Sequence, residues 1–233
     1  MKVHFEEIFT DCTKLATKIP QANYLPSGRY PVVDQGQSQI AGYTNTSEGL
    51  FTDVPAIIFG DHTRIVKYID TPFFIGADGV KVLKSILQDA NYKYLFYALN
   101  NVKIPNTGYN RHFKWLKESS INLSDRKEQK RIAERLDKVQ ELIALQKEQL
   151  KKLDDLIKSR FIDLFGNPII NPKGWPLKRM GDLFKITSGG TPSRKHSEYF
   201  ENGDIPWVKT GDLNTPYLTF TDEYITKLGV QKS

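Results

Sequence analysis

The feature that most constrains this chain is a long segment without a single Gly or Pro, which runs from Asp125 to Phe165. It opens with an Asp-x-x-Glu capping box, Asp125 and Glu128, and it closes at Gly166. These signals predict one continuous helix. At 1.5 Å per residue such a helix is about 60 Å long, which is longer than a small domain is wide.

Apolar residues recur along this segment in alternating steps of four and three, which is the spacing of a coiled-coil seam. The predicted seam consists of Ile132, Leu136, Val139, Ile143, Leu150, Leu153, Ile157 and Leu164, with Gln146 and Arg160 at the two interrupting positions. One neighbouring domain cannot cover so long a stripe, so the pattern predicts a partner helix. The alternative is a helix that packs lengthwise on its own domain.

The chain also contains an internal repeat. The segment "GRYPVVDQG" at 28–36 recurs as "GDIPWVKTG" at 203–211, and the matching continues outward at the same offset without a gap. The alternative is two unrelated strands that share turn chemistry. The repeat predicts one complete domain and the first part of a second. We therefore divide the chain into a first domain at 1–123, a long spacer and dimerisation helix at 124–166, and a partial second domain at 167–233.

The first domain is predicted to be α+β. An amphipathic helix is expected around 5–18 and another around 86–100, and β-rich pieces separated by Gly, Asp and Pro turns lie between them. These pieces are "YPVVDQG", "IAGYT", "PAIIFG", "TRIVKYI" and "FFIG". The whole chain is thus an α+β, β-rich domain with flanking helices, then a coiled-coil helix and a partial second α+β domain.

Charge and composition exclude several classes of protein. The net charge is +6, and the three predicted segments carry +2 each (13−11, 11−9 and 9−7), so no segment stands out as a polyanion-binding patch. Cys12 is the only cysteine, which excludes an internal disulfide. The sequence has no apolar run long enough for a membrane span and no apolar stretch typical of a signal peptide at its start, so we expect a cytoplasmic protein.

Two loops combine amide, aromatic and basic groups that can read DNA, "DQGQSQIAGY" and "NTGYNRHFK", and the turn "GDHTR" can contact phosphate. Gln and Asn can read adenine, Arg can read guanine, and Tyr or His can stack or bind phosphate. Ordinary solvated turns have the same composition. The predicted DNA-contacting residues are Gln35, Gln37, Gln39, Tyr43, His62, Arg64, Tyr109, Asn110, Arg111 and His112.

Catalytic motifs are missing from the sequence. The segments "DTPF" at 70–73 and "NTPY" at 214–217 carry Thr where the base-binding loop of an amino-methyltransferase has its first Pro. No Gly-rich cofactor loop or phosphate-binding loop is present, and the four histidines lack metal-ligand spacing. We therefore expect no catalytic residues, no metal site and no cofactor in this chain.

The order of these parts resembles the specificity subunit of type I restriction-modification systems. The resemblance covers nearly the whole chain and is most specific at "EQKRIA" and at "GGTPSRK" with the following "IPWVKTGDL". It implies two target recognition domains at opposite ends of an antiparallel helix pair, each reading half of a split DNA sequence. It also implies a non-catalytic subunit that positions methyltransferase and restriction subunits, with S-adenosylmethionine, ATP and magnesium on those partners.

The chain departs from this family in one respect. A full specificity subunit would complete the second domain and add a second long helix, so we expect a fragment or a half-subunit that pairs with its own copy and reads a palindromic split target. Open strand edges are expected at 176–233. Two other classes stay open: a standalone restriction endonuclease or methyltransferase, and a coiled-coil adaptor that does not bind DNA.

Overall fold

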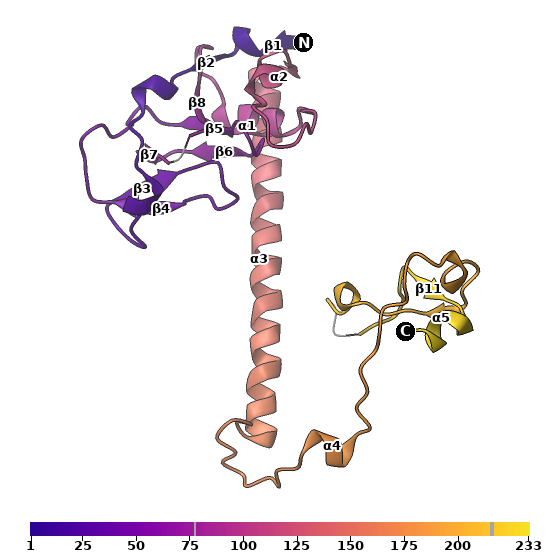
Figure 1. Cartoon of the computed structure of the whole chain (residues 1–233). Coiled ribbons are helices and arrows are strands. Elements are labelled where there is room, and N and C mark those ends of the chain that lie inside the picture. The colour runs from indigo at the N-terminus through magenta and orange to yellow at the C-terminus, as the bar shows by residue number, and fades with distance from the viewer. Residues whose placement is uncertain (77, 215–216) are drawn as a thin grey trace. The chain divides into compact units, whose positions relative to one another are not determined.

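The computed structural model describes residues 1–76, 78–214 and 217–233. The chain forms two compact units, Met1–Ile157 and Lys158–Ser233, which are treated separately below. Figure 1 shows the elements of each unit along the chain. The predicted boundaries after residues 123 and 166 separate a domain, a helix and a partial domain, whereas the two compact units are separated by their internal contacts. The predicted boundaries therefore stay a prediction.

The first unit is built on a four-stranded antiparallel sheet with the strand order β2-β8-β5-β6. Its strands are β2 (Phe9–Asp11), β5 (Ala56–Gly60), β6 (Val66–Ile69) and β8 (Val80–Ser85). Every residue of β5 is buried, because this central strand is covered on both faces. Strands β5 and β6 correspond to the predicted pieces "PAIIFG" and "TRIVKYI".

A second sheet has the order β4-β3-β7, in which β3 pairs antiparallel with β4 and parallel with β7. Its strands are β3 (Tyr30–Val33), β4 (Gly42–Thr44) and β7 (Phe74–Ile75). A separate pair joins β1 (Lys2–His4) to β9 (Ser120–Asn122), with Val3 opposite Ile121. This pair ties the beginning of the chain to the segment just before the long helix.

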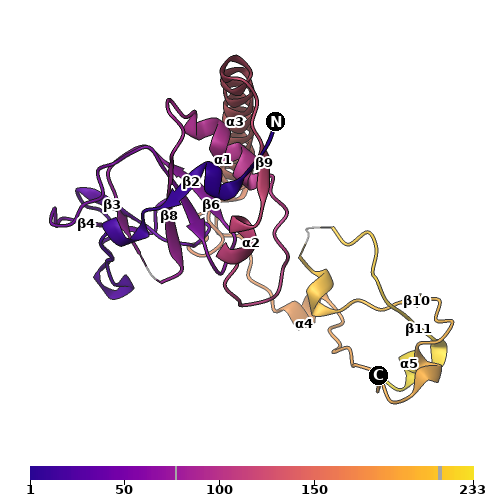
Figure 2. The same cartoon turned by 90° about the horizontal axis from the view of Figure 1, so that it is seen from above.

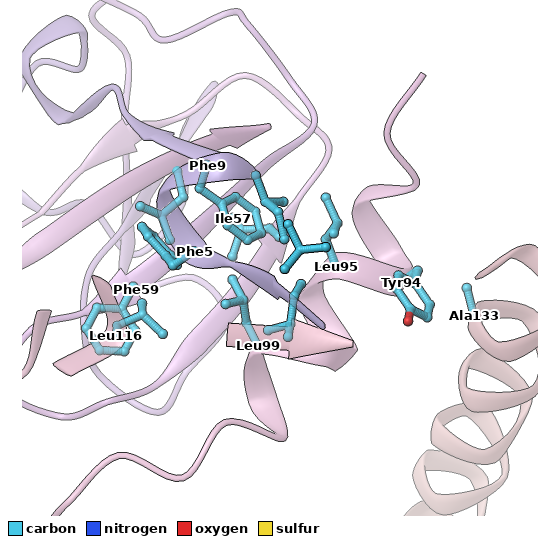
Figure 3. Close-up of a cluster of buried hydrophobic side chains, with 13 residues drawn as sticks. Phe5, Phe9, Ile57, Phe59, Tyr94, Leu95, Leu99, Leu116 and Ala133 are labelled. Carbon is cyan, nitrogen blue, oxygen red and sulfur yellow. The ribbon is translucent and has the colours of Figure 1, made fainter. Parts of the chain in front are cut away.

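Successive side chains of a strand point to opposite faces, so the central sheet supports two cores. On one face, Ile57, Phe59 and Leu83 pack with the helices α1 (Tyr92–Asn100) and α2 (Phe113–Lys117). Figure 3 shows this cluster with Phe59, Leu99 and Leu116 among its members. On the other face, Ile58 and Val82 pack with residues of the second sheet. The α+β fold of the first unit is therefore as predicted.

The helix predicted at 5–18 is wrong. One short strand, β2, and two 3-10 turns, at Phe5–Glu7 and Thr13–Leu15, occupy this segment, and β1 lies just before it. Phe5, Ile8 and Phe9 are buried as the pattern required, but β1 and β2 satisfy their backbone groups by pairing with β9 and β8. Pairing between strands distant in sequence thus overrides a local helical pattern.

The helix predicted at 86–100 begins later than expected. Asn91 is the N-cap residue of α1, and its side chain accepts a hydrogen bond from Tyr94 N at 3.0 Å. Just upstream, Asp89 has φ +54°, a left-handed conformation that no helix continues through. The residues between β8 and Asn91 therefore form a turn and not the first part of the helix.

The long helix is confirmed as α3 (Arg126–Phe165). Asp125 caps it, because its side chain accepts a hydrogen bond from Glu128 N at 2.9 Å. At its end Gly166 has φ +78°, the left-handed C-terminal conformation that Gly adopts without steric cost. In the described part of the chain no helix combines the length and the apolar character that a membrane span requires.

Within the first unit, only the first turns of α3 pack against its sheets and the helices α1 and α2. Ala133 is buried in the same core as Tyr94, and Gln129 donates to Ser124 O at 2.8 Å. Figures 1 and 2 agree that α1 lies beside this part of α3. Lys93 and Tyr97 of α1 both bond Asp137 of α3. Burial pulls the pKa of Asp137 upward, but these two hydrogen bonds outweigh it and lower that pKa.

The second unit contains the helices α4 (Met180–Leu183) and α5 (Lys227–Gln231) and the antiparallel strands β10 (Ile205–Pro206) and β11 (Tyr224–Ile225). Like β3 and β4, its two strands pair antiparallel. Pro31 lies opposite Tyr43 in the first unit, and Pro206 lies opposite Tyr224 in the second. Pro31 and Pro206 occupy matching positions of the internal repeat, whereas their partners Tyr43 and Tyr224 do not.

Candidate nucleic-acid interface

Three segments that the sequence singled out meet on the first unit. We call them the glutamine loop (residues 34–39), the histidine turn (60–64) and the tyrosine loop (106–112), and together they form the recognition face. The glutamine loop connects β3 to β4, the histidine turn connects β5 to β6, and the tyrosine loop precedes α2. Both views place β3 and β4 at the edge of the first unit opposite α3 (Figure 1, Figure 2).

Gln35 joins the glutamine loop to the histidine turn. Its side-chain Nε2 donates to Asp78 O at 3.0 Å, and its Oε1 accepts from His62 N at 3.1 Å. The Thr63 hydroxyl donates to Gln35 O at 2.7 Å. Both ends of the Gln35 amide thus make hydrogen bonds inside the protein and link the glutamine loop to the histidine turn, and the prediction that Gln35 reads a base stays a prediction.

The histidine turn meets the tyrosine loop through an aromatic stack. The rings of His62 and Tyr109 lie 4.6 Å apart and are inclined by only 8°. Tyr109 is 86% exposed, so its outer face is open to a ligand. Beneath the stack, Gly79 has φ +84°, and an added Cβ would lie 2.7 Å from His62 Cδ2. Only Gly fits there while His62 keeps this position.

Asp61 joins the histidine turn to the end of the tyrosine loop by hydrogen bonds. Its backbone O accepts from His112 N at 2.8 Å, and its Oδ1 accepts from Phe113 N at 2.8 Å. His112 is completely buried, and its Nδ1 donates to Asp61 O at 3.0 Å. The prediction that His112 contacts DNA is therefore wrong, because the ring lies in the core and fixes the end of the loop.

The remaining predicted residues of these loops stay at the surface. Gln37, Gln39, Asn110 and Arg111 are exposed. Gln39 Nε2 donates to Tyr68 O at 2.7 Å, and the Asn110 amide bonds Thr107 O within its own loop. These four residues and Tyr109 are therefore available to a ligand, either directly or by exchange of one hydrogen bond.

Arg111 contributes positive charge near the glutamine loop. The pKa of Asp78 is lowered, first by its hydrogen bond and ion pair with Lys18 and to a smaller extent by the charge of Arg111. The guanidinium thus lies near the carboxylate whose backbone oxygen binds Gln35. Exposed cationic groups of this kind can contact a phosphate or a guanine edge.

Two predicted residues lie away from this contact network. Arg64, which has φ +62°, donates from Nη1 to Ile104 O at 3.4 Å and lines a groove with Leu99 and Val102. Tyr43 lies in β4 opposite Pro31, where it is half-buried. The contacts described above therefore do not join these two side chains to the His62 and Tyr109 stack.

One residue of this region was missed at the sequence level. Lys67 of β6 has only 3% of its side chain exposed, yet it hydrogen bonds to the backbone of the glutamine loop. The signal was the strand periodicity, because Lys67 and Ile69 occupy the same inward face of β6. A lysine at an inward strand position requires an internal partner.

The predicted seam residues of α3 divide into two groups. Ile132 packs against the core of the first unit, and Leu136 lines a groove with Tyr97. The prediction that Ile132 pairs with a second helix is therefore corrected, because its side chain contacts the core instead. The other predicted residues are between 43% and 68% exposed, namely Val139, Ile143, Leu150, Leu153, Ile157 and Leu164. The alternative of a helix packed lengthwise on its own domain is therefore excluded for this part of α3.

Metal ligands are not grouped in the described structure. Across residues 1–76, 78–214 and 217–233, no three His, Cys, Asp or Glu side chains are placed to hold one ion. Within the motif "NTPY" at 214–217, residues 215 and 216 lie outside the described part of the chain.

Comparison with known proteins decides the family. The model for the type I restriction modification DNA specificity domain matches residues 2–155 and 172–230. The chain belongs to this family. The specificity subunit of the type I restriction enzyme EcoR124I/EcoR124II from Escherichia coli is 28% identical over 218 residues, which are 87% of this chain and 53% of that subunit. The MjaIX specificity subunit from Methanocaldococcus jannaschii is 33% identical over 131 residues, 50% of this chain and 30% of that one. The chain thus spans about half or less of the length of these curated relatives.

Solved structures of the family have a similar fold. The S subunit of a type I restriction-modification system from M. genitalium matches with a TM-score of 0.53 at 19% identity, over 97% of this chain and 62% of that one. A chain from a structural study of type I complex assembly and conformational transition matches with a TM-score of 0.50 at 16% identity, over 68% of this chain and 43% of that one. The α+β specificity-domain fold with its long helix is therefore shared.

Proposed function

We propose that this chain is a non-catalytic specificity subunit whose first unit reads one half of a split DNA target. The observation that carries the proposal is the convergence of the glutamine loop, the histidine turn and the tyrosine loop on one face. Amide, aromatic and cationic groups stand together there on a rigid scaffold of strand ends. Such groups suit hydrogen bonds to base edges and phosphates from the major groove.

The chemistry is proposed to reside in partner subunits. Methyltransferase subunits would bind S-adenosylmethionine, and restriction subunits would bind ATP and magnesium. The same function implies a cytoplasmic location, where the DNA and these partners are found. The alternative of a standalone endonuclease or methyltransferase is disfavoured, since the relatives of this chain are named specificity subunits.

A second copy is proposed to cover the exposed part of the α3 seam in an antiparallel arrangement. Val139 would lie opposite Ile157, Ile143 opposite Leu153, and Gln146 opposite Leu150. Arg160 favours this direction, because it would face the apolar Leu136 region of the second copy, whereas a parallel dimer would stack Arg160 on Arg160. Along the edges of the seam, Leu142 would meet Leu156 and Arg135 would meet Asp163, which adds apolar contact and charge complementarity.

This pairing gives α3 the role of a spacer. Two copies of the first unit would stand at opposite ends of the helix pair, and the length of α3 would fix the gap between the two half-sites. A symmetric pair predicts a palindromic split target. A coiled-coil adaptor without DNA binding would need the same helix but leaves the recognition face unexplained.

The proposal is tested by selection from a pool of DNA duplexes with a randomised central segment. The chain in complex with its methyltransferase subunit should enrich one short split sequence. The enriched sequence should depend on the recognition face and not on added nucleotide or metal. A complex that binds all duplexes equally would refute sequence reading, and cleavage or methyl transfer by the chain alone would refute the non-catalytic role.

A further inference from the structure

A buried ammonium group lies under the glutamine loop. Lys67 Nζ donates to Asp34 O at 2.7 Å and to Ser38 O at 2.6 Å, and it lies 3.5 Å from Asp34 Oδ1. An ammonium group can donate three protons, and here it donates to two backbone oxygens and has the Asp34 carboxylate as an ion-pair partner. Only 3% of the Lys67 side chain is exposed, so the group is shielded from solvent.

The two carbonyl oxygens come from opposite ends of one short segment. Asp34 and Ser38 flank the tip of the loop, and Asp34 Oδ1 also accepts a hydrogen bond from Gly36 N at 2.8 Å. The lysine therefore holds both ends of the tip by the backbone, and it does so whichever side chains the tip carries. This geometry fixes the direction of the tip without using any of its side chains.

The same contacts distinguish the three glutamines of the loop. The Gln35 amide is bonded to Asp78 and His62, and the Gln39 amide is bonded to Tyr68. Gln37 is exposed, and among the residues that the structure describes its side chain has no hydrogen-bond partner. Of the three, Gln37 alone has all of its side-chain donors and acceptors left for a ligand, and a glutamine amide can bond both the N6 and N7 atoms of adenine.

We propose that Lys67 is the positioning residue of the glutamine loop and that Gln37 is its base-reading residue, with an adenine edge in the major groove as the expected ligand. The inference rests on the proposed DNA-reading function and deepens it. A loop fixed before binding does not have to be ordered on the DNA, so the conformational entropy lost on binding is smaller. Substitution of Lys67 should therefore weaken sequence recognition by leaving the Gln37 side chain less well positioned.

The chain offers a matched control in Lys84 of β8. Its Nζ donates to Asp53 O at 3.0 Å, to Asp53 Oδ1 at 2.7 Å and to Pro55 O at 2.9 Å. The partners are of the same kinds as those of Lys67, namely two backbone oxygens and one aspartate carboxylate. These contacts hold the turn before β5, which is not part of the recognition face.

Electrostatics separates the two lysines further. Burial lowers the pKa of Lys67 despite the opposing charge of Asp34. For Lys84, burial is outweighed by hydrogen bonds to Asp53 and Tyr92, and its pKa is raised. The charged form is therefore disfavoured by folding at Lys67 and favoured at Lys84.

The experiment compares Lys67→Met, Lys84→Met and Gln37→Ala in the complex with the methyltransferase subunit. The two probes are the duplex enriched by the wild type and the same duplex with its sequence scrambled. Lys67→Met and Gln37→Ala should each lower the ratio of affinities for the two probes by about 10-fold or more, which is the discrimination of one bidentate base contact. Affinity for the scrambled duplex and its salt dependence should stay unchanged, and Lys84→Met should keep the wild-type ratio.

A double variant tests the coupling. If Lys67 acts through Gln37, the combination of both substitutions should lower the ratio no further than either substitution alone. A wild-type ratio in Lys67→Met overturns the positioning role, and a wild-type ratio in Gln37→Ala overturns the reading role. A wild-type complex that shows no preference between the probes would instead overturn the proposed function itself. Gln37 lies at an exposed tip, so its substitution leaves the fold intact even where Lys67→Met does not.

Discussion

Substitution of Leu153 tests the pairing of the α3 helices quantitatively. Leu153 is 55% exposed in the single helix, and in the proposed antiparallel dimer it would lie against Ile143 of the second copy. Leu153→Ala should weaken association without harming the first unit, because the side chain lies far along α3 from the turns that pack on that unit. Alanine also favours the helical conformation, so α3 itself should persist.

The size of the effect follows from the buried area. Truncation to alanine removes three carbon groups worth about 0.8 kcal/mol each when buried. Because 55% of Leu153 is still exposed before pairing, roughly half of this, about 1.3 kcal/mol, is lost per copy. The symmetric dimer carries the substitution twice, so the free energy of association should weaken by about 2.6 kcal/mol. The dissociation constant should therefore rise close to 100-fold.

Sedimentation equilibrium over a range of chain concentrations measures this change. The matched control is Leu145→Ala, since Leu145 is 48% exposed on the same helix but lies off the seam. Leu145→Ala should leave the dissociation constant within about 2-fold of the wild type, in line with the small effects of surface substitutions. The reasoning is refuted if both substitutions weaken association equally, or if the wild-type chain remains a monomer at tens of micromolar.

Three further predictions concern the first unit. Arg111→Ala should weaken DNA binding by about 1 to 3 kcal/mol if the guanidinium meets a base, and by less with a reduced salt slope if it meets only phosphate, as salt titrations will show. Burial, followed by the hydrogen bond to Asp137, raises the pKa of Tyr97 to about 12. The unfolding free energy should therefore fall as pH rises from about 10, the usual tyrosine pKa, toward that value, and Tyr97→Phe should flatten this decline in urea titrations. Lys84→Met should lower the thermal midpoint in calorimetry, because it leaves the backbone oxygens of Asp53 and Pro55 without their donor, and an unchanged midpoint would contradict this role.

Several features of the fold were predictable because local signals determine them. The capping residue Asp125 and the terminal Gly166 limit α3 by short-range hydrogen bonds and backbone conformation, and the structure places the helix between them. The strands β3, β5 and β6 follow from apolar runs bounded by turns. The repeat was visible because Gly and Pro occupy the same turn positions in both units.

Other features depend on contacts between distant segments and could not be predicted. The segment at 5–18 carries a helical apolar pattern, yet the pairing of β2 within it with β8, and of β1 just before it with β9, decides its conformation. His112 is of a residue type that often contacts DNA, but its ring is buried in the core and hydrogen bonds to Asp61, which is far away in sequence. Gln35, Gln37 and Gln39 are alike in sequence, and only the positions of Asp78, His62 and Tyr68 distinguish them.

Methylation mapping in cells that carry the complete system tests the central claim most directly. Wild-type cells should show one split methylated sequence with a gap of constant length. In cells with Gln37→Ala and Arg111→Ala together, the bases required within that sequence should become less restricted, whereas the gap should stay the same because α3 is unchanged. An identical sequence requirement in the variant cells would contradict the account, because the recognition face would then take no part in reading DNA.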